Sequence, residues 1–467
     1  MTSVRSHLQR LSGSKILILV LIVSILSSCG IFVQEKRYKR PKTTHKPNKK
    51  ADPIKKDTFE IENDQVVKIP EIKEEDLYEK YGSEFKNQYK IGVILPLKGK
   101  NHPEDLASLQ EDVSYRFVNY YGGLLLALED LENSKVGFDV EIINSSMSKN
   151  DGYLLMNQLN RLNLDLIIGP YDRELLKEVA RYGKRKDIPV ISPWQSSSKI
   201  TEDNPNYVQL KPDIKTFFNA IVEHTDKHFS ADQVYLVGRE FNRQEASRIS
   251  YFQEVHFSND AGPSSKKSTP YNVFYVVEDS LSMGETAFDS LFFEQKNKEI
   301  AVIIPNWSYR DEQFIYSCMR KLNAEKLDVH VVVYGMPIMV ETDKIGFNLY
   351  KNLNLRVALE SYIDKSNYRV IDFREKYYNK YGAIPNIDAF SGYDVMSYLG
   401  TNLINHGTKF QYFLPDVEQE FLHTSYDIKS VISDENLKKE IYDQIDYYEN
   451  VHINIMGFEY NAFQIMD

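Results

Sequence analysis

The amino-acid sequence predicts an α/β fold with two Rossmann-like lobes, each built on a parallel sheet with helices on both faces. Short, nearly continuous apolar runs alternate with amphipathic segments of helical period, a pattern typical of parallel strands buried between helices. The alternation runs twice along the chain, first over 89–194 and again over 215–337. With 467 residues, the chain is long enough for two lobes of ordinary size after a tail is set aside.

The first set of elements begins at Tyr89, where YKIGVILPL (89–97) predicts a buried strand. A helix is expected over 114–133, in which Gly122 and Gly123 allow close packing against a neighbour. Strands and helices then alternate. The expected strands are 138–146, 164–170 and 188–194, and the expected helices are 152–163 and 173–186.

The second set begins with a helix over 215–229. The strands expected after it are 233–240, 271–278, 299–307 and 328–337, and the helices are 242–255, 284–295 and 310–324. Ligands in such sheets bind at the carboxyl ends of the strands. The candidate segments for a site are therefore Pro96 to Lys98, Gly169 to Tyr171, Ser192 to Ser198, Gly238 to Phe241, Pro305 to Ser308, and Tyr334 with Gly335.

The N-terminal residues have the features of a secretion signal. A basic segment precedes the apolar run ILILVLIVSIL (16–26), which is too short to span a bilayer comfortably. The run ends in Leu-Ser-Ser-Cys, which resembles the bacterial lipobox and implies cleavage before Cys29 and lipid attachment to its thiol. We expect a signal peptide over 1–28 and a basic, proline-containing, flexible linker over 29–88, with a short helix near 74–85.

Charge and cysteine content exclude several classes of function. The first 56 residues carry 13 Lys and Arg against 2 acids, whereas the rest of the chain is strongly acidic. An acidic body argues against nucleic acid as the main partner. The two cysteines, Cys29 and Cys318, give no disulfide framework, and Cys318 is expected to be a small buried residue in a helix. His224 and His228 have metal-ligand spacing but no third ligand, so surface histidines and no metal are expected.

Several segments resemble the type I periplasmic-binding-protein family, which includes branched-chain amino-acid receptors and lipoprotein activators of peptidoglycan synthases. The resemblance is carried by IGVILPLKG (91–99), by DLIIGPYDRELLKEVARYGKRKDIPVISPWQSSSKITEDNPNYVQLKP (165–212) and by FREKYYNKYGAIPNIDAFSGYDVMSYL (373–399). It implies two lobes joined by three crossings. Lobe one would comprise 89–212 plus 340–424, and lobe two 213–339 plus 425–467.

The resemblance also implies a ligand in the cleft between the lobes, contacted by Ser196 and Ser197. The sequence departs from the amino-acid receptors at two pairs, Tyr171-Asp172 and Trp194-Gln195, which suit a larger or stacking ligand or a cleft that binds nothing. A serine of this loop is equally expected to cap a helix beginning near Lys199. The strand-end residues of the second set are further candidates: Asn306 and Trp307 contact ligand or pack between the lobes, and Arg239 and Glu240 face the cleft or pair with each other.

No catalytic constellation accompanies these residues. The chain has no G-x-S-x-G nucleophile turn and no phosphate-binding loop, so we expect no enzymatic activity and no cofactor. The favoured hypothesis is a lipid-anchored receptor of the bacterial cell envelope, facing the periplasm from the outer membrane, for an amino-acid-like, peptide or sugar-like solute. The alternative is a regulatory or structural lipoprotein that contacts cell-wall synthesis enzymes and has a degenerate or empty cleft.

Overall fold

The computed structural model describes residues 74–97, 113–145, 151–197, 199–259, 269–282, 284–293, 299–416, 418–432 and 445–466. The expected signal peptide over 1–28, the expected lipidation of Cys29 and most of the expected linker lie outside the described residues, as do Lys98 and Ser198. The chain from Glu71 onward forms one compact unit. Its first element is the helix α2 (Glu74–Tyr81), which confirms the short helix expected here.

The segment 78–86, which comprises the last turn of α2 and the residues after it, contacts the 3₁₀ segment 407–416, far away in the sequence. The ring of Tyr81 stacks on that of Tyr412, with centroids 3.7 Å apart. Two hydrogen bonds join Glu84 and Thr408, since Glu84 N donates to the side-chain Oγ1 of Thr408 at 3.0 Å and Thr408 N donates to Glu84 O at 3.1 Å. We call this contact the N-terminal clamp.

The first sheet, sheet A, has the strand order β13-β14-β5-β4-β3-β1-β2. The strands β1 to β5 are parallel, β14 pairs parallel with β5, and β13 pairs antiparallel with β14. Their bounds are β1 (Gln88–Leu95), β2 (Gly137–Asn144), β3 (Leu166–Ile168), β4 (Val190–Ser192), β5 (Tyr207–Gln209), β13 (Ile428–Ile432) and β14 (Ile445–Asn450).

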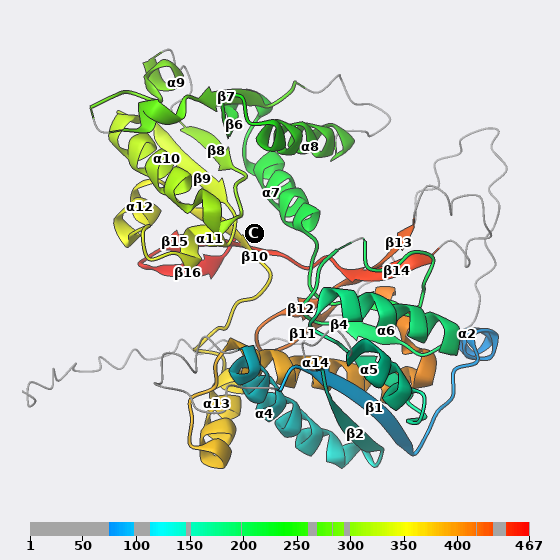
Figure 1. Cartoon of the computed structure of the whole chain (residues 1–467). Helices are drawn as coiled ribbons and strands as arrows, with labels where there is room; N and C mark the ends of the chain where they lie inside the picture. The colour runs from blue at the N-terminus through cyan, green and yellow to red at the C-terminus, as the bar shows by residue number, and fades with distance from the viewer. Residues whose placement is uncertain are drawn as a thin grey trace, which may run out of the picture. The chain divides into compact units, whose positions relative to one another are not determined.

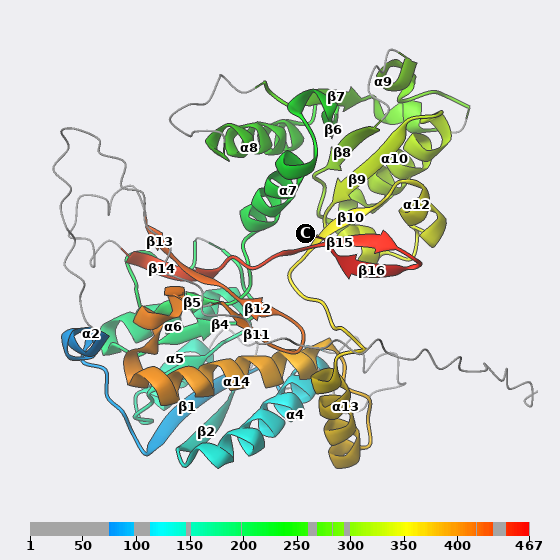
Figure 2. The same ribbon diagram turned by 180° about the vertical axis from the view of Figure 1, so that it is seen from behind.

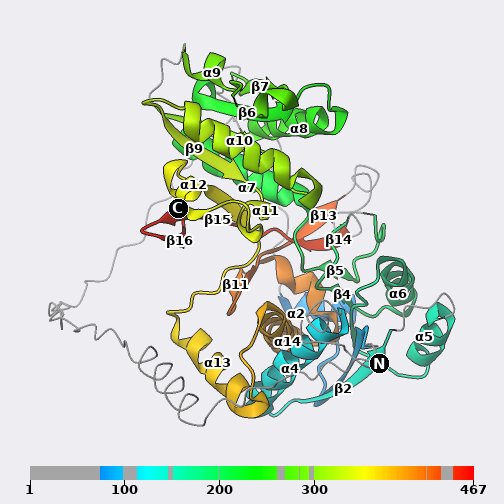
Figure 3. The ribbon, with the colours of Figure 1, turned by 60° about the vertical axis from the view of Figure 1, so that its left-hand side comes forward.

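Alternating side chains of β1 divide the core of lobe one into two layers. Ile91, Val93 and Leu95 pack with the helices on one face, and Ile94 packs with those on the other. The first face is covered by α4 (Val113–Leu131) and α14 (Ile387–His406), with α13 (Tyr368–Tyr381) beside them (Figure 1). The second is covered by α5 (Asp151–Leu159) and α6 (Arg173–Lys186), as Figure 3 also shows. Both faces are therefore buried, as the apolar strand runs predict.

The expected close helix packing occurs between α4 and α14. A Cβ atom on Gly123 would overlap the carbonyl oxygen of Ala389, and one on Gly392 would overlap that of Tyr120. The two backbones therefore lie in direct contact, which only glycine at these positions allows.

The second sheet, sheet B, has the strand order β16-β15-β10-β9-β8-β6-β7, with β6 to β10 parallel and β15 and β16 antiparallel. The strands are β6 (Val234–Arg239), β7 (Asn272–Val276), β8 (Glu299–Ile304), β9 (His330–Gly335), β10 (Arg356–Leu359), β15 (Asn454–Glu459) and β16 (Ala462–Ile465). The helices are α7 (Ile214–His228), α8 (Arg243–Asn259), α9 (Asp289–Phe293), α10 (Glu312–Glu325), α11 (Ile338–Glu341) and α12 (Phe347–Asn352). The expected helix over 284–295 is thus shortened to α9.

The remaining elements are short. They are the 3₁₀ segments η1 (Glu132–Ser134), η2 (Ala231–Gln233), η3 (Glu278–Leu281), η4 (Tyr309–Asp311) and η5 (Gly407–Asp416), and the two-stranded sheet of β11 (Gln419–Glu420) and β12 (Ser425–Tyr426).

The strand pairing places the lobe boundaries differently from the expected division. Residues 356–359 were expected in lobe one but form β10 of sheet B, and 428–432 and 445–450 were expected in lobe two but form β13 and β14 of sheet A. The chain therefore returns to lobe one after Leu359 rather than at 340, and leaves it after Asn450 rather than at 424. In sheet B, β10 lies between β15 and β9, and in sheet A, β14 lies between β5 and the edge strand β13. The crossings number three, as expected, and Figure 2 shows them running between the sheets from β5 to α7, from β10 to α13 and from β14 to β15.

Candidate functional site

The turn after β3 forms part of the floor at the carboxyl edge of sheet A. Gly169 has φ +85°, and a Cβ atom there would lie 2.8 Å from the carbonyl oxygen of Ile94 and 2.9 Å from the indole of Trp194. Only glycine tolerates both the positive φ and this close approach. The Gly-Pro signal in the sequence therefore marks a place where three strand ends and an indole ring meet.

An aromatic cluster covers this floor. The ring of Trp194 packs edge-on against Phe117 at 4.9 Å and Tyr120 at 5.0 Å between centroids, and more distantly against Tyr171 at 6.4 Å. Edge-to-face packing of this kind stabilises each ring pair by about 0.5–1.5 kcal/mol beyond the burial of area. Trp194 and Tyr171 are only half-buried, so each keeps a surface for further contact.

Gln195 holds the loop after β4 against the loop after β3. Its Nε2 donates to the main-chain carbonyl oxygen of Tyr171 at 2.6 Å, and its main-chain carbonyl oxygen accepts from Ser192 Oγ at 3.1 Å. The carboxylate of Asp172 accepts from the amides of Glu174 at 3.0 Å and Leu175 at 2.9 Å, so it caps α6. The structure thus gives both residues roles within lobe one.

Ser197 is held by three hydrogen bonds within the chain. Its amide donates to Gln209 Oε1 at 2.8 Å, and its Oγ accepts from Arg173 Nη2 at 3.1 Å and from the amide of Lys199 at 3.2 Å. The expected helix near Lys199 is wrong, because residues 199–206 form turns. The serine hydroxyl instead stabilises a turn, which it does by the same chemistry as a helix cap.

A cavity of 380 Å³, which we call cavity 1, opens beside the aromatic cluster. Tyr171 and Trp194 line it, and the other candidates of the first lobe do not. Its remaining lining residues are Arg116, Pro193, Leu210, Lys211, Pro212, Glu341, Glu360, Ser361, Ile387, Asp388, Ser391, Val395, His423, Thr424 and Tyr426. They come from the loop after β4, the first turn of α4, the first three turns of α14, the first two crossings, the end of α11, and β12 with the residues before it. Apart from Pro193, the strand-end rule identifies none of them.

Two ion pairs, each of one cationic and one anionic side chain, line cavity 1. Arg116 Nη2 lies 3.0 Å from Asp388 Oδ1, and this hydrogen bond raises the pKa of the Arg116 guanidinium. Lys211 Nζ, on the first crossing, lies 3.1 Å from Glu360 Oε1, on the second. The other oxygen, Glu360 Oε2, is buried without a hydrogen-bond partner among the described residues. A buried carboxylate oxygen without a donor is costly, which makes it a natural acceptor for a ligand.

His423 and Asp394 form a buried pair in the wall of the same cavity. The Oδ2 atom of the fully buried Asp394 accepts from the His423 amide at 2.8 Å and contacts His423 Nδ1 at 2.5 Å. The carboxylate therefore fixes the imidazole with a proton on Nδ1. Neither residue follows a predicted strand, so the strand-end rule does not identify them. The available signal was an acid in the middle of a helix with many apolar residues, because a buried charge needs a partner.

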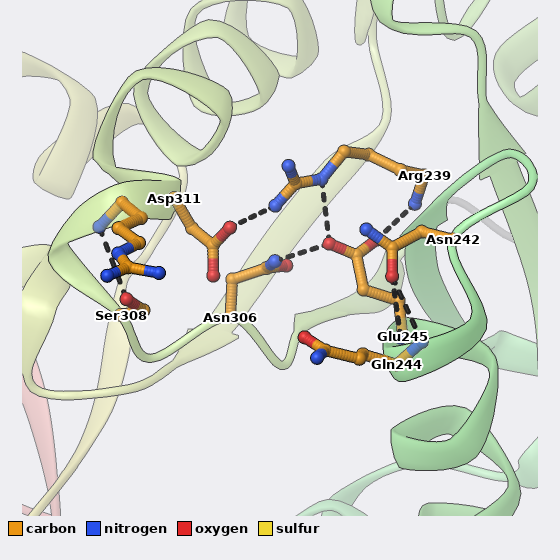
Figure 4. Close-up of polar contacts among 8 residues, drawn as sticks. Arg239, Asn242, Gln244, Glu245, Asn306, Ser308 and Asp311 are labelled. Carbon is orange, nitrogen blue, oxygen red and sulfur yellow. Dashed lines mark hydrogen bonds and ion pairs between the residues drawn. The ribbon is translucent and has the colours of Figure 1, made fainter.

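The candidates at the ends of the sheet B strands separate into a buried network and exposed residues. Arg239 does not pair with Glu240, which is exposed. Arg239 Nε donates to Glu245 Oε1 at 2.7 Å, and its Nη2 pairs with Asp311 (Figure 4). Asn306 is fully buried and its Nδ2 donates to the same Glu245 oxygen at 2.7 Å. Arg239 and Asn306 therefore belong to the interior of lobe two, where they join β6, β8 and α8.

A second cavity, which we call cavity 4, has a volume of 460 Å³. Ser196 of lobe one and Trp307 of lobe two both line it, so each lobe contributes one of the expected residues. Trp307 is 50% exposed and does not belong to the buried core. The sequence left open whether this indole packs between the lobes or lies free for a ligand, and the exposed ring at a cavity wall favours the second reading.

His224 and Cys318 are buried within lobe two, whereas His228 lies at its surface. His224 is buried and its Nδ1 lies 2.9 Å from Tyr334 OH, so the expectation of a surface histidine is wrong for it, whereas His228 is exposed. No group of three potential metal ligands occurs among the described residues. Cys318 is fully buried in α10, as expected, and burial raises the pKa of its thiol.

Comparison with known families identifies the class of protein. Residues 121–418 match the family model described as "Receptor family ligand binding region". The match covers more than half of the chain, which therefore belongs to this family, and the resemblance to type I periplasmic binding proteins is confirmed. A search of curated proteins found no match.

Solved structures give the same fold. A putative branched-chain amino acid ABC transporter protein from Rhodospirillum rubrum is 13% identical with a TM-score of 0.56, over 81% of this chain and 100% of its own. An ABC transporter substrate-binding protein from Desulfitobacterium hafniense is 12% identical with a TM-score of 0.51, over the same shares. At this identity the likeness establishes the two-lobed architecture alone. Within the part of the chain that is described, no helix is long and apolar enough to cross a membrane.

Proposed function

We propose that this protein is a non-catalytic receptor of the cell envelope that binds a small polar solute, amino-acid-like or larger, in cavity 1. The observation that carries the proposal is the presence of two ion pairs in the cavity lining, Arg116 with Asp388 and Lys211 with Glu360, beside a Glu360 oxygen that has no hydrogen-bond partner among the described residues. The volume of 380 Å³ lies in the range of small-molecule sites, about 300–1,000 Å³.

This arrangement suits a ligand that carries both a cationic and an anionic group. A ligand carboxylate placed near Arg116 replaces one side of the Asp388 pair, and a ligand ammonium near Glu360 satisfies its free oxygen. Charge-assisted hydrogen bonds of this type are about twice as strong as neutral ones. The half-buried faces of Tyr171 and Trp194 offer a stacking surface for the rest of the ligand.

Binding at this place couples naturally to movement of the lobes. Lys211 and Glu360 belong to the first two of the three crossings, so a ligand that contacts them acts on the segments that join the lobes. Closure of two lobes about such segments is a common way for a binding protein to signal occupancy to a partner. A transporter or sensor that recognises the closed form is the partner we propose.

The proposal also includes the location of the protein in the cell. The Leu-Ser-Ser-Cys sequence after the apolar run supports cleavage before Cys29 and acylation of its thiol, with the body on the periplasmic side of the outer membrane. Metabolic labelling with a fatty acid tests this directly. Label is expected in the unaltered chain and not in the Cys29→Ser variant, and equal labelling of both contradicts lipidation.

A second candidate function is a regulatory or structural lipoprotein that acts on cell-wall enzymes through its surface. The observation that favours it is that Gln195, Ser197 and Asp172 use their side chains within lobe one, which leaves fewer polar groups for a ligand.

A thermal-shift screen of the chain from Gly30 onward separates the two candidates. The panel contains amino acids, short peptides, sugars and muropeptides. A ligand at 100 times its Kd stabilises the folded state by about 2.7 kcal/mol. We expect a hit whose shift is lost in Glu360→Gln and kept in the matched control Glu240→Gln, since Glu240 is exposed and lines neither cavity. A panel without any hit refutes the receptor.

A further inference from the structure

Cavity 4 lies at the carboxyl ends of β8, β9 and β10 and has a different character from cavity 1. Much of its wall is apolar, with Phe217, Met336 and Ile338 almost fully buried behind it and the half-exposed indole of Trp307 at its edge. An exposed tryptophan beside a deep apolar wall is a contact surface for an apolar group. Cavity 1, in contrast, is lined mainly by charged and hydroxyl-bearing side chains.

The two cavities share one wall. Lys211, Pro212, Glu341, Glu360 and Ser361 line both of them. The wall consists of the first two crossings and the end of α11, so it lies between the strand ends of sheet A and those of sheet B. A ligand in cavity 1 therefore reaches cavity 4 by passing along a polar surface.

We infer that the ligand is a short peptide, with a charged terminus in cavity 1, a peptide bond along the shared wall and an apolar side chain against Trp307. This inference rests on the proposed receptor function and names its ligand class. A free amino acid occupies one cavity and leaves the other without a ligand contact.

The polar wall decides between a peptide and other ligands with an apolar end. A hydrocarbon chain along this wall would cover Lys211, Glu360 and Ser361 without offering them a hydrogen bond, which costs free energy for each group. A peptide bond offers one donor and one acceptor at that position. The Glu360 oxygen that lacks a partner is a suitable acceptor for the peptide N–H or the terminal ammonium.

Titration calorimetry of the chain from Gly30 onward tests the inference with four probes: phenylalanine, Gly-Gly, Gly-Phe and Phe-Gly. We expect at least one of the Phe-containing dipeptides to bind about tenfold more tightly than both phenylalanine and Gly-Gly, because it alone fills both cavities. The Trp307→Ala variant is expected to lower the affinity for that dipeptide to the level of Gly-Gly, and to leave Gly-Gly itself unchanged.

Tyr153→Ala is the matched control, because it also removes an exposed aromatic ring but lines neither cavity. Tyr153→Ala is expected to leave the affinity for every probe unchanged. The melting temperature of Trp307→Ala is measured as well, and a value near that of the unaltered chain shows that this variant is folded. If phenylalanine binds as tightly as both dipeptides, or if Trp307→Ala weakens Gly-Gly as much as the Phe-containing dipeptide, the peptide inference is wrong while the receptor stands. If none of the probes and no compound of the wider panel binds, both are wrong.

Discussion

Glu245 is the residue whose replacement tests the buried network of lobe two most directly. Its carboxylate accepts from the Arg239 main-chain amide, from Arg239 Nε at 2.7 Å and from Asn306 Nδ2 at 2.7 Å, and the side chain is 1% exposed. The Glu245→Ala variant leaves all three donors in a buried site, and Asp311 remains to pair with the Arg239 guanidinium.

The magnitude follows from these contacts. Removing one partner of a buried ion pair costs about 3–5 kcal/mol, and the remaining Asp311 pair places the expected loss at the lower end, about 3 kcal/mol. For a unit of 150–250 residues, 1 kcal/mol lowers the melting temperature by about 2–4 °C, so we expect a decrease of about 6–12 °C.

Thermal unfolding followed by circular dichroism measures this change, and Glu240→Ala is its control. The two glutamates are near neighbours in the sequence, but Glu240 is exposed. Its replacement is expected to alter the melting temperature by about 2 °C or less, because exposed surface substitutions usually change stability by no more than about 0.5 kcal/mol. An equal or larger decrease in Glu240→Ala would refute the assignment of the network to Glu245.

Three further predictions concern other buried positions. Gly392→Ala places a methyl group on the carbonyl of Tyr120 and is expected to unfold lobe one or lower its melting temperature by more than 10 °C, and near-native melting would contradict the α4–α14 contact. Asp394→Asn removes the carboxylate that fixes His423, so ¹⁵N-histidine NMR is expected to show loss of the Nδ1–H tautomer, whereas an unchanged spectrum argues against the pair. Burial lowers the pKa of His224 to about 4, so the unfolded chain binds the proton first and stability is lost as the pH falls from about 6.5 to about 4. His224→Gln is expected to lose less stability than the unaltered chain between pH 7 and pH 5, and parallel curves would show that this residue does not titrate as described.

The alternating strands and helices of each lobe could be predicted from the sequence because each parallel strand is a continuous apolar run between two amphipathic helices. The strands β10 and β14 could not. Strand β10 has only four residues, and β14 reads IDYYEN, a largely polar segment whose partner β5 lies more than 200 residues away. Such strands are defined by pairing, which leaves little trace in local sequence.

The residues of the candidate site also divide into those that the sequence predicts and those that it does not. The strand-end rule finds Tyr171, Trp194 and Trp307, because Trp194 and Trp307 end predicted strands and Tyr171 directly follows one. It does not find Arg116 and Asp388, which lie in the first turns of two helices that meet only in the folded chain. The sequence pattern gives no information on the contact between Arg116 and Asp388, because this contact depends on how α4 and α14 are aligned along each other.

The N-terminal clamp has a mechanical consequence. Because 78–86 is joined to η5 by ring stacking and by two hydrogen bonds between Glu84 and Thr408, a force that reaches Tyr78 from upstream residues acts directly on lobe one. It reaches lobe two through the three crossings and through contacts such as the hydrogen bond from Thr216 Oγ1 in α7 to Glu449 Oε1 in β14. Tension from the N-terminal side therefore loads the two lobes unequally.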